Sequence, residues 1–530
     1  MMQAHKISVF KSWVSEWMAR SVIFAILITC LFSFAFYGSP VAAMGFYGIQ
    51  PTDVQYGMVV IYASTVAFLA LDFRIIKYFA PRKYLLIALA VNAICSVICF
   101  HLKYWTLFVI CQFFQGITCA LMSGIVLQLI FPRLQSIRAR VIAYSLLYGS
   151  IQIAVPLYSI FTSVVIHFFD FNWLFYGFVI ILIILTITVL LTMNSKARFT
   201  KKNPLYQVDW IGYLFYVSFI LILGYILVYG RQSGWFGCSL ITTLSVINLI
   251  ILSFFIIREL KLKRPLINLQ IFKTKNFVIG LLLLFTFYIF KGSTGLAYGY
   301  LEIILGIDPL STIPIWTSVI FGTTMSMFIT SRFVLMGYNL IRMIIAGFVI
   351  MAIYYAYMIV FVSVQGETID FILPMFIYGV ATGVLFVPIV SFTASSAPPA
   401  IAINASLVGI LARFTGFTAS LALNNELQLL AKSGVREKVR EALTETNPQL
   451  PATLLDIQNQ YMNAGRDIYT SKAVSSSYFN QMVGHQIFAR AIGDYYDLML
   501  TGVIFVIVIL LLLPQIQNVV LRLRKGIIPY

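Results

Sequence analysis

The sequence has few charged residues for its length. Only 10% of its 530 residues are charged and 61% are hydrophobic, whereas a soluble domain carries about 25% charged residues. So few charges could not cover the surface of a large water-soluble protein. The composition therefore excludes that class and predicts an all-α polytopic membrane protein.

The chain also lacks the patterns of catalysis and metal binding. Its four histidines, His5, His101, His167 and His485, have no metal-ligand spacing, and neither a P-loop nor a G-x-S-x-G segment occurs. Five of the six cysteines lie inside apolar runs and Cys238 borders one, so we expect no disulfide and no zinc site. A membrane acyl- or glycosyltransferase would need an acid or histidine pair at the interface, and none stands out. We expect neither an enzyme nor an ATP-driven pump, and no cofactor or metal.

Long apolar runs dominate what is present. A membrane-spanning helix needs about 20 mostly apolar residues. Such runs lie near 21–45, 55–73, 84–101, 105–130, 140–165, 171–192, 210–229, 238–257, 277–301, 312–331, 341–363, 371–394, 400–424 and 497–516. The sequence therefore predicts 14 transmembrane helices.

Lysine and arginine alternate between the connections. Every second connection is basic, including the one with Arg82 and Lys83, while the short connections between them hold only Lys103 and Arg231. Because basic connections stay in the cytoplasm, this pattern predicts that 1–20 and 517–530 are both cytoplasmic. The net charge of +18 is then a topology signal, and we expect no nucleic-acid partner.

One connection, 425–496, is long and faces the other side of the membrane. Apolar residues recur at helical spacing from Asn425 to Glu445, and further helices are expected near 452–463 and 474–493. Thr446, Asn447, Pro448 and Pro451 should break the first of these helices. We expect this loop to form a helical cap that either docks another protein or packs on itself.

Several short segments occur in a characteristic order. They are Gln115-Gly116 with Ala120, Asp209-Trp210-Ile211-Gly212, Gly230 to Trp235, Arg264 to Leu269 with Phe272, Gly379 to Gly383, and Arg413 to Gly416. In these segments the whole chain resembles the major facilitator superfamily, in its fourteen-helix drug:H⁺ antiporter branch, the EmrB/QacA-like transporters.

The resemblance implies a fold and a function. The expected fold is two six-helix bundles, 21–192 and 277–516, with two extra transmembrane helices within 193–276. The expected function is secondary transport in the inner membrane, exporting small amphipathic compounds by alternating access. Some relatives work with a periplasmic adaptor and an outer-membrane channel, which implies similar partners here. A uniporter, an exporter of one metabolite, and a non-transporting scaffold or receptor stay open as alternatives.

The sequence departs from the family where protons are thought to be coupled. The first span has no acid and only Tyr37 and Ser39 as polar side chains near mid-depth. Gln112 replaces the family's arginine, and Asp72 is displaced from the usual acidic position by about six residues. Pro156 is what remains of a glycine-rich element in the fifth span. Proton coupling therefore stays open.

Polar side chains inside apolar runs are the candidate site residues, because charges at that depth are costly. Lys291 is a candidate for substrate binding or coupling, or else a lysine paired for packing. Arg413 is expected to be an anion partner or a structural clamp. Glu302, whose spacing of eleven residues could place it on one face of the same span as Lys291, either titrates in transport or is solvated at the rim. Gln112, Gln115, Tyr148, Gln152 and Tyr37 are further candidates for the transport pathway, and helix-to-helix hydrogen bonds explain them equally well. Asp72, Arg82, Lys83 and Pro156 are assigned to gating, although Arg82 and Lys83 also fit the charge bias alone.

Overall fold

The fold is all-helical in a computed structural model that describes residues 9–76, 78–130, 149–195, 197, 208–262, 264–397, 402–442 and 449–512. Within these ranges, regular structure other than helix is limited to an isolated bridge between Phe10 and Met193. Twelve helices of the described chain are long and apolar enough to cross a membrane. The predicted helical membrane architecture is confirmed, and the count of fourteen spans stays a prediction.

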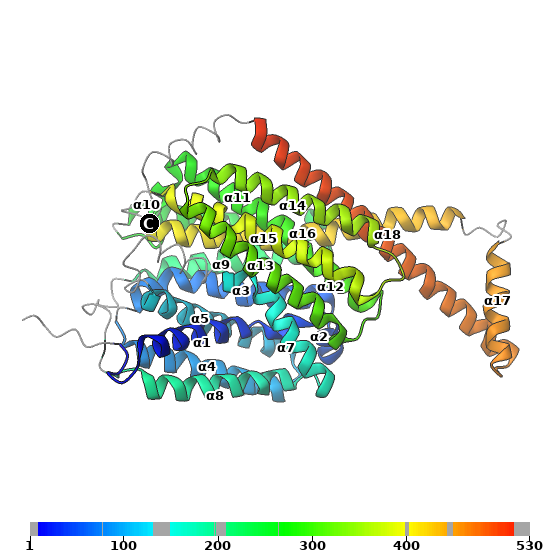
Figure 1. Ribbon diagram of the computed structural model, residues 1–530, viewed down its shortest axis with the longest axis horizontal. Helices are drawn as coiled ribbons and strands as arrows, with labels where there is room; N and C mark the ends of the chain where they lie inside the picture. Colours follow the sequence, from blue (N-terminus) through cyan, green and yellow to red (C-terminus); the bar gives the residue numbers. More distant parts are fainter. Residues whose placement is uncertain are drawn as a thin grey trace, which may run out of the picture.

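The first half of the chain forms one bundle. Its helices are α1 (Glu16–Phe32), α2 (Pro40–Tyr47), α3 (Pro51–Ile75), α4 (Pro81–His101), α5 (Trp105–Ile130), α7 (Ala154–Phe168) and α8 (Trp173–Thr192). They lie together in Figure 1, coloured blue to cyan. We call them the N-terminal bundle.

The run 21–45 is not one helix, contrary to expectation. It is divided into α1, the 3-10 turn η1 (Ala35–Gly38) and α2. The Ser39 side chain caps α2 by accepting a hydrogen bond from Ala42 N at 3.3 Å, and Pro40 follows at the first helical position. Because proline has no N–H to continue a preceding helix, these two residues restart the chain as a separate helix.

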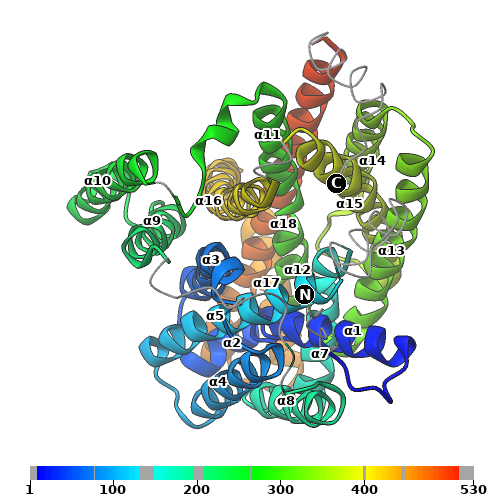
Figure 2. The same cartoon turned by 90° about the vertical axis from the view of Figure 1, so that its left-hand side faces the viewer.

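Two helices stand beside the bundles. They are α9 (Trp210–Tyr229) and α10 (Ser239–Lys261), and Figure 2 shows them to one side, next to α3 and α16. A short 3-10 segment, η5 (Leu269–Lys273), then leads into the second half.

The second half forms the C-terminal bundle. Its elements are α11 (Lys275–Lys291), α12 (Thr294–Ile303), η6 (Pro309–Thr312), α13 (Ile313–Leu335), α14 (Leu340–Phe361), α15 (Thr368–Ser395), α16 (Ala402–Ala442) and α18 (Ile468–Leu512). Glycines let α13 and α15 pack closely. A side chain added at Gly379 would lie 2.6 Å from the Val319 carbonyl oxygen, and one at Gly322 would lie 2.6 Å from the Phe376 carbonyl oxygen.

The run 277–301 is interrupted at Gly292-Ser293, between α11 and α12. Asn424 donates to the Gly292 carbonyl at 3.0 Å, and Tyr355 donates to the Phe290 carbonyl at 2.7 Å. These side chains satisfy carbonyls that a continuous helix would have bonded itself. Lys291 and Glu302 therefore lie on separate helices, α11 and α12, and the spacing that could have placed them on one face of a single helix does not apply.

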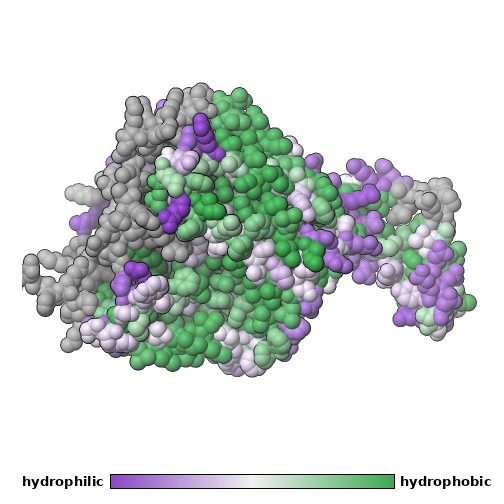
Figure 3. Space-filling model, in the orientation of Figure 1, coloured by the Kyte–Doolittle hydropathy of each residue, from purple (hydrophilic) through white to green (hydrophobic). Residues whose placement is uncertain are grey.

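The long connection is a helical arm. The part of α16 after Asn425, helix α17 (Gln449–Asn463) and the part of α18 before Ile492, where that helix enters the hydrophobic core, make up what we call the arm. The arm projects beyond the bundles in Figure 1. Figure 3 shows a broad hydrophobic surface on the bundles and hydrophilic residues concentrated toward the arm. The helix expected near 474–493 is continuous with the last span in α18, and Pro451 lies inside the first turn of α17, where proline is tolerated.

Candidate functional site

The two bundles meet in the middle of the molecule at Lys291, the last residue of α11. Its ammonium donates to the Gln152 side-chain oxygen, and Gln152 donates to the Tyr288 hydroxyl at 3.4 Å. The ammonium also lies 5.4 Å from the centre of the Tyr288 ring. Gln152 is buried and comes just before α7 of the N-terminal bundle. Two predicted site residues from opposite halves are thus brought together, and we call them, with Tyr288, the junction.

A second cation belongs to the same region. Arg413 of α16 is 6% exposed, and its guanidinium carbon lies 5.1 Å from the centre of the Phe386 ring. Helices α11 and α16, which carry Lys291 and Arg413, pack against each other. The chain thus holds two basic side chains inside the molecule, next to the contact between its halves.

Further contacts between the bundles lie toward the end from which the arm projects, which we call the arm end. Ser39 donates to Glu302 at 2.8 Å, and the Gln55 and Asn425 amides exchange hydrogen bonds of 3.1 and 2.7 Å. The Ser163 and Thr312 hydroxyls lie 3.4 Å apart. Among the residues that the structure describes, the hydrogen bonds between side chains of the two bundles lie at the junction or at the arm end. Glu302 is therefore part of the arm-end contact and not of the junction.

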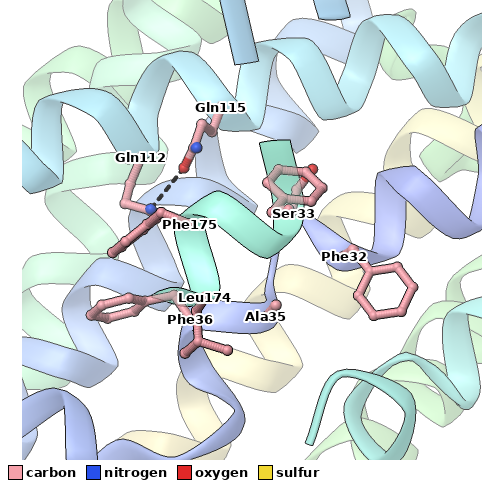
Figure 4. A pocket seen from close by; sticks show the side chains of 9 residues that line it. Phe32, Ser33, Ala35, Phe36, Gln112, Gln115, Leu174 and Phe175 are labelled. Atoms are coloured by element: carbon pink, nitrogen blue, oxygen red, sulfur yellow. Dashed lines mark hydrogen bonds between the residues drawn. The ribbon is translucent and has the colours of Figure 1, made fainter. Parts of the chain in front are cut away.

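The other predicted pathway residues form a hydrogen-bonded chain inside the N-terminal bundle. Tyr37 donates to Gln112 at 3.2 Å, Gln112 to Gln115 at 2.8 Å, and Gln115 to Ser96 at 3.1 Å. The two glutamines also border a pocket. Figure 4 shows their bond beside the aromatic and aliphatic side chains that line it, among them Phe36 and Phe175. Each of these side-chain donors has an acceptor. The hydrogen bonds therefore satisfy buried polar groups, which is a structural role, and two of the residues also line a pocket.

Asp72 is buried near the far end of α3, at 1% exposure. Its carboxylate accepts a hydrogen bond from Tyr84, and its second oxygen lies against Gly124 of α5 without a hydrogen bond from the described residues. Arg82 is half-buried and Lys83 is exposed at the start of α4. Pro156 is buried in the first turn of α7. Tyr148 lies outside the described residues.

A charged cluster joins the two extra helices to each other. Asp209, the residue before α9, accepts hydrogen bonds from Arg258 of α10 at 2.8, 3.1 and 3.2 Å, and one from Gly212 N at 3.0 Å. Burial alone would raise the pKa of the Asp209 carboxyl, but the Arg258 hydrogen bonds, together with the Gly212 N–H, lower it below its ordinary value. The Asp209-Trp210-Ile211-Gly212 segment therefore has a structural role at the start of α9.

The sequence reasoning missed several participants. Tyr288, Tyr84, Gln55 and Asn425 each bind a predicted site residue or join the two halves. The sequence offered one signal for Tyr84, because this residue directly follows the basic pair Arg82-Lys83. No local pattern connects Gln55 with Asn425, which are 370 residues apart in the chain.

Two helical bundles, joined by side chains at the junction and at the arm end, define the class as a multi-pass membrane protein with two halves. Residues 22–421 match the model of the Major Facilitator Superfamily, and the chain belongs to this superfamily. A solved structure with a similar fold is that of a peptide transporter POT in complex with sulfate. It has a TM-score of 0.54 and 12% identity and covers 94% of this chain and 95% of that one.

Two relatives are bacterial export or resistance proteins. The multidrug export protein EmrB of Escherichia coli (strain K12) is 25% identical over 297 residues, which is 54% of this chain and 55% of EmrB. The probable multidrug resistance protein EmrY of the same organism is 26% identical over 283 residues, which is 50% of this chain and 51% of EmrY. The chain thus spans about half the length of the curated relatives it matches.

Proposed function

We propose that this protein is a secondary transporter that exports small amphipathic organic compounds by alternating access. The observation that carries the proposal is the junction, where Lys291 of one bundle binds Gln152 of the other. A charged side chain at this depth is costly and marks a substrate or ion pathway more often than a packing contact. The relatives' names, multidrug export protein and multidrug resistance protein, support the substrate class.

The contacts at the arm end support the mechanism. Ser39–Glu302 and Gln55–Asn425 join the bundles on that side by hydrogen bonds between uncharged groups or to a single carboxylate. Such bonds have a modest net free energy, about 0.5–1.5 kcal/mol each for neutral pairs. They can therefore break and re-form during each cycle. Rocking of the bundles about the junction would open the arm end after closing the opposite one.

The protein is proposed to lie in the inner (cytoplasmic) membrane with both termini in the cytoplasm. The basic connections carrying Arg74, Arg82 and Arg258 support this orientation through the positive-inside rule. The arm then faces the periplasm. Its two long helices and α17 offer a helical surface on which a periplasmic adaptor could dock, with an outer-membrane channel beyond.

Proton coupling is assigned to Glu302 and Asp72. Both are carboxylates at depth, and in each a single oxygen has a hydrogen bond from the described residues, from Ser39 and Tyr84 respectively. The free oxygen of each carboxylate is available to take a proton when the bundles move. Without such coupling the protein would act as a uniporter.

Two experiments test the function. Drug susceptibility is compared in cells with and without the gene, and an unchanged susceptibility profile would favour a transporter of one metabolite or a scaffold. Purified protein in proteoliposomes is then given an imposed pH gradient and a panel of fluorescent amphipathic compounds. Flux that requires the protein supports the proposal, and flux that responds to the gradient supports coupling. Absence of flux for every compound contradicts transport of this substrate class.

A further inference from the structure

We infer that the arm is a rigid lever of the C-terminal bundle, and that its root latches it to the N-terminal bundle while the arm end is closed. The root consists of Asn424, Asn425 and Glu426, three consecutive residues of α16. This inference rests on the proposed function, because it takes the two bundles to rock. It adds that the arm swings whenever the arm end opens, so that a protein docked on the arm is moved by the transport cycle.

The arm is joined to the C-terminal bundle by two helices that have no break. Both α16 and α18 pass from the bundle into the arm as single helices, as Figure 1 shows. Neither contains a proline, a common cause of sharp kinks. The part of α16 beyond Asn425 is about 25 Å long. A tilt of the bundle is therefore carried into the arm and displaces its tip further than its root.

Contacts inside the arm hold its helices together. The Lys432 ammonium of α16 lies 3.9 Å from the centre of the Phe488 ring of α18. Helix α17 packs against α18, with the centres of the Tyr461 and Tyr478 rings 6.4 Å apart. These contacts join all three helices, so the arm moves as one body with the bundle that carries it.

Asn424 ties both long helices to the C-terminal bundle at the root. It accepts a hydrogen bond of 2.6 Å from the Tyr495 hydroxyl of α18 and donates one of 3.0 Å to the Gly292 carbonyl, at the break between α11 and α12. Asn424 and Tyr495 are only 6% and 1% exposed. Because water does not reach these bonds to compete for them, we expect them to persist while the bundles rock.

The next two residues of the root bind the other side of the molecule. Successive residues of an α-helix point about 100° apart around its axis, so the root reaches three different neighbours. Asn425 exchanges hydrogen bonds of 3.1 and 2.7 Å with Gln55 of α3. Glu426 pairs with Arg231 at 3.1 Å and accepts a hydrogen bond of 3.0 Å from Trp235 Nε1. Both partners of Glu426 lie between α9 and α10.

The connection between α9 and α10 is fixed to the N-terminal bundle. The Tyr229 hydroxyl of α9 donates to Asp53 of α3 at 2.6 Å, and Thr52 of α3 donates to Gln232 at 2.9 Å. Helix α9 also packs along α3. This connection therefore moves with the N-terminal bundle.

Opening of the arm end then breaks the bonds of Asn425 and Glu426 but not those of Asn424. The side chains of Arg231 and Glu426 are 32% and 26% exposed, and an ion pair in contact with solvent contributes little free energy. The latch can therefore open and close in each cycle.

The test measures three distances between nitroxide labels by pulsed electron paramagnetic resonance. The full-length protein carries Cys238→Ser and is studied in lipid nanodiscs; the other five cysteines are buried. Labels are placed in pairs at three exposed positions: Lys103→Cys of the N-terminal bundle, Gln365→Cys of the C-terminal bundle and Gly484→Cys of the arm. The first two report the opening of the arm end, and each of them paired with the third reports the arm against one bundle.

We expect a single narrow distance between the arm and the C-terminal bundle. The distance between the arm and the N-terminal bundle should have two components, whose proportions follow those of the pair that reports opening. Glu426→Gln removes the charge that pairs with Arg231 and should raise the longer component of both these pairs about two- to fivefold. Glu437→Gln is the matched control, since it makes the same change at an exposed residue of α16 beyond the root, and it should leave all three distances unchanged.

The outcomes separate the lever from the transport function. A broad distance between the arm and the C-terminal bundle, or an arm that moves independently of the opening, would overturn the lever even if flux is normal. A single opening distance in the wild type and in Glu426→Gln would overturn it too, because no movement would reach the arm. Linked movement of arm and opening, without flux of any compound, would support the lever and contradict the proposed export.

Discussion

The Ser39 hydroxyl donates a hydrogen bond of 2.8 Å to the Glu302 carboxylate, and this bond joins the two bundles at the arm end. Ser39 also caps α2 through Ala42 N. One serine thus connects the break in the first span to a carboxylate at the end of α12. If protonation of Glu302 weakens the bond, it also loosens the contact between the halves.

Glu302→Gln is expected to abolish transport driven by a pH gradient while leaving the fold intact, because the amide still accepts the Ser39 hydrogen bond but cannot release a proton. Flux in proteoliposomes with and without the gradient is the measurement. Gln55→Ala is the matched control, since it removes a neutral hydrogen bond at the same arm end but keeps the Glu302 carboxylate and its bond to Ser39, and it should retain coupling.

Asp72→Asn provides the second half of this test. Asp72 is buried beside Tyr84 and Gly124, away from the arm end. If Glu302→Gln and Asp72→Asn both transport with normal dependence on the gradient, neither carboxylate couples protons, and a uniporter or another route becomes the better account.

Gly379→Ala should destabilise the C-terminal bundle by about 1–3 kcal/mol, because overpacking forces backbone shifts. The added methyl would lie 2.6 Å from the Val319 carbonyl oxygen and 3.1 Å from Thr323 N of α13. Thermal unfolding in detergent measures the change. Gly484 of the arm has nothing within 4 Å of an added side chain, and Gly484→Ala should instead stabilise its helix slightly. Equal melting temperatures for the two variants would show that α13 and α15 are not packed as described.

Asp209→Asn should destabilise the contact between α9 and α10 at neutral pH by roughly 1.5–3 kcal/mol, since it removes the charge that Arg258 binds. The pKa of Asp209 is lowered in the folded protein. Its stabilising contribution is therefore full above the ordinary aspartate pKa of about 3.9 and is lost as the pH falls through the lowered value. The difference in melting temperature between wild type and variant should accordingly shrink on acidification below pH of about 4.

Glu16→Gln is the control for that experiment. Glu16 and Arg20 form an ion pair of 3.5 Å between largely exposed side chains, and such pairs contribute little. If Asp209→Asn melts at pH 7 no lower than Glu16→Gln does, the Asp209–Arg258 ion pair does not have the stabilising role described here.

Removing 430–485 deletes most of the arm and should leave insertion and proteoliposome flux near wild-type levels, while drug resistance of cells is lost. The reason is that the junction and the Gln55–Asn425 contact lie outside the deleted segment, whereas a docking surface for an adaptor would lie within it. If resistance survives the deletion, the arm has no role in export. If flux from purified protein is lost as well, the arm acts as part of the transporter itself.

The helices were predictable because apolar runs of membrane length are a strong local signal. The breaks within the helices were not predictable. In the sequence Gly292-Ser293 looks like an ordinary small-residue segment, and only the fold shows that Asn424 and Tyr355 bind the carbonyls beside the break. The continuity of α18 was hidden for a similar reason, because its polar first half and apolar second half look like separate elements.

The site was predictable residue by residue but not as an arrangement. A lysine or arginine in an apolar run stands out on physical cost alone, and Lys291 and Arg413 are such residues. Their partners are far away in the chain, with Gln152 139 residues from Lys291. Only the fold brings such groups together, and it separates Glu302 from Lys291, which the sequence had joined.

The most direct test of alternating access is a reversible cross-link at the arm end. Gln55→Cys and Asn425→Cys are combined, because these side chains exchange hydrogen bonds across the bundles and belong to neither the junction nor the coupling residues. Flux of a fluorescent amphipathic compound is measured in proteoliposomes, after oxidation and again after reduction, with each single variant alongside. The account predicts that oxidation stops flux in the double variant alone and that reduction restores it. Full flux through protein shown to be completely cross-linked would contradict it.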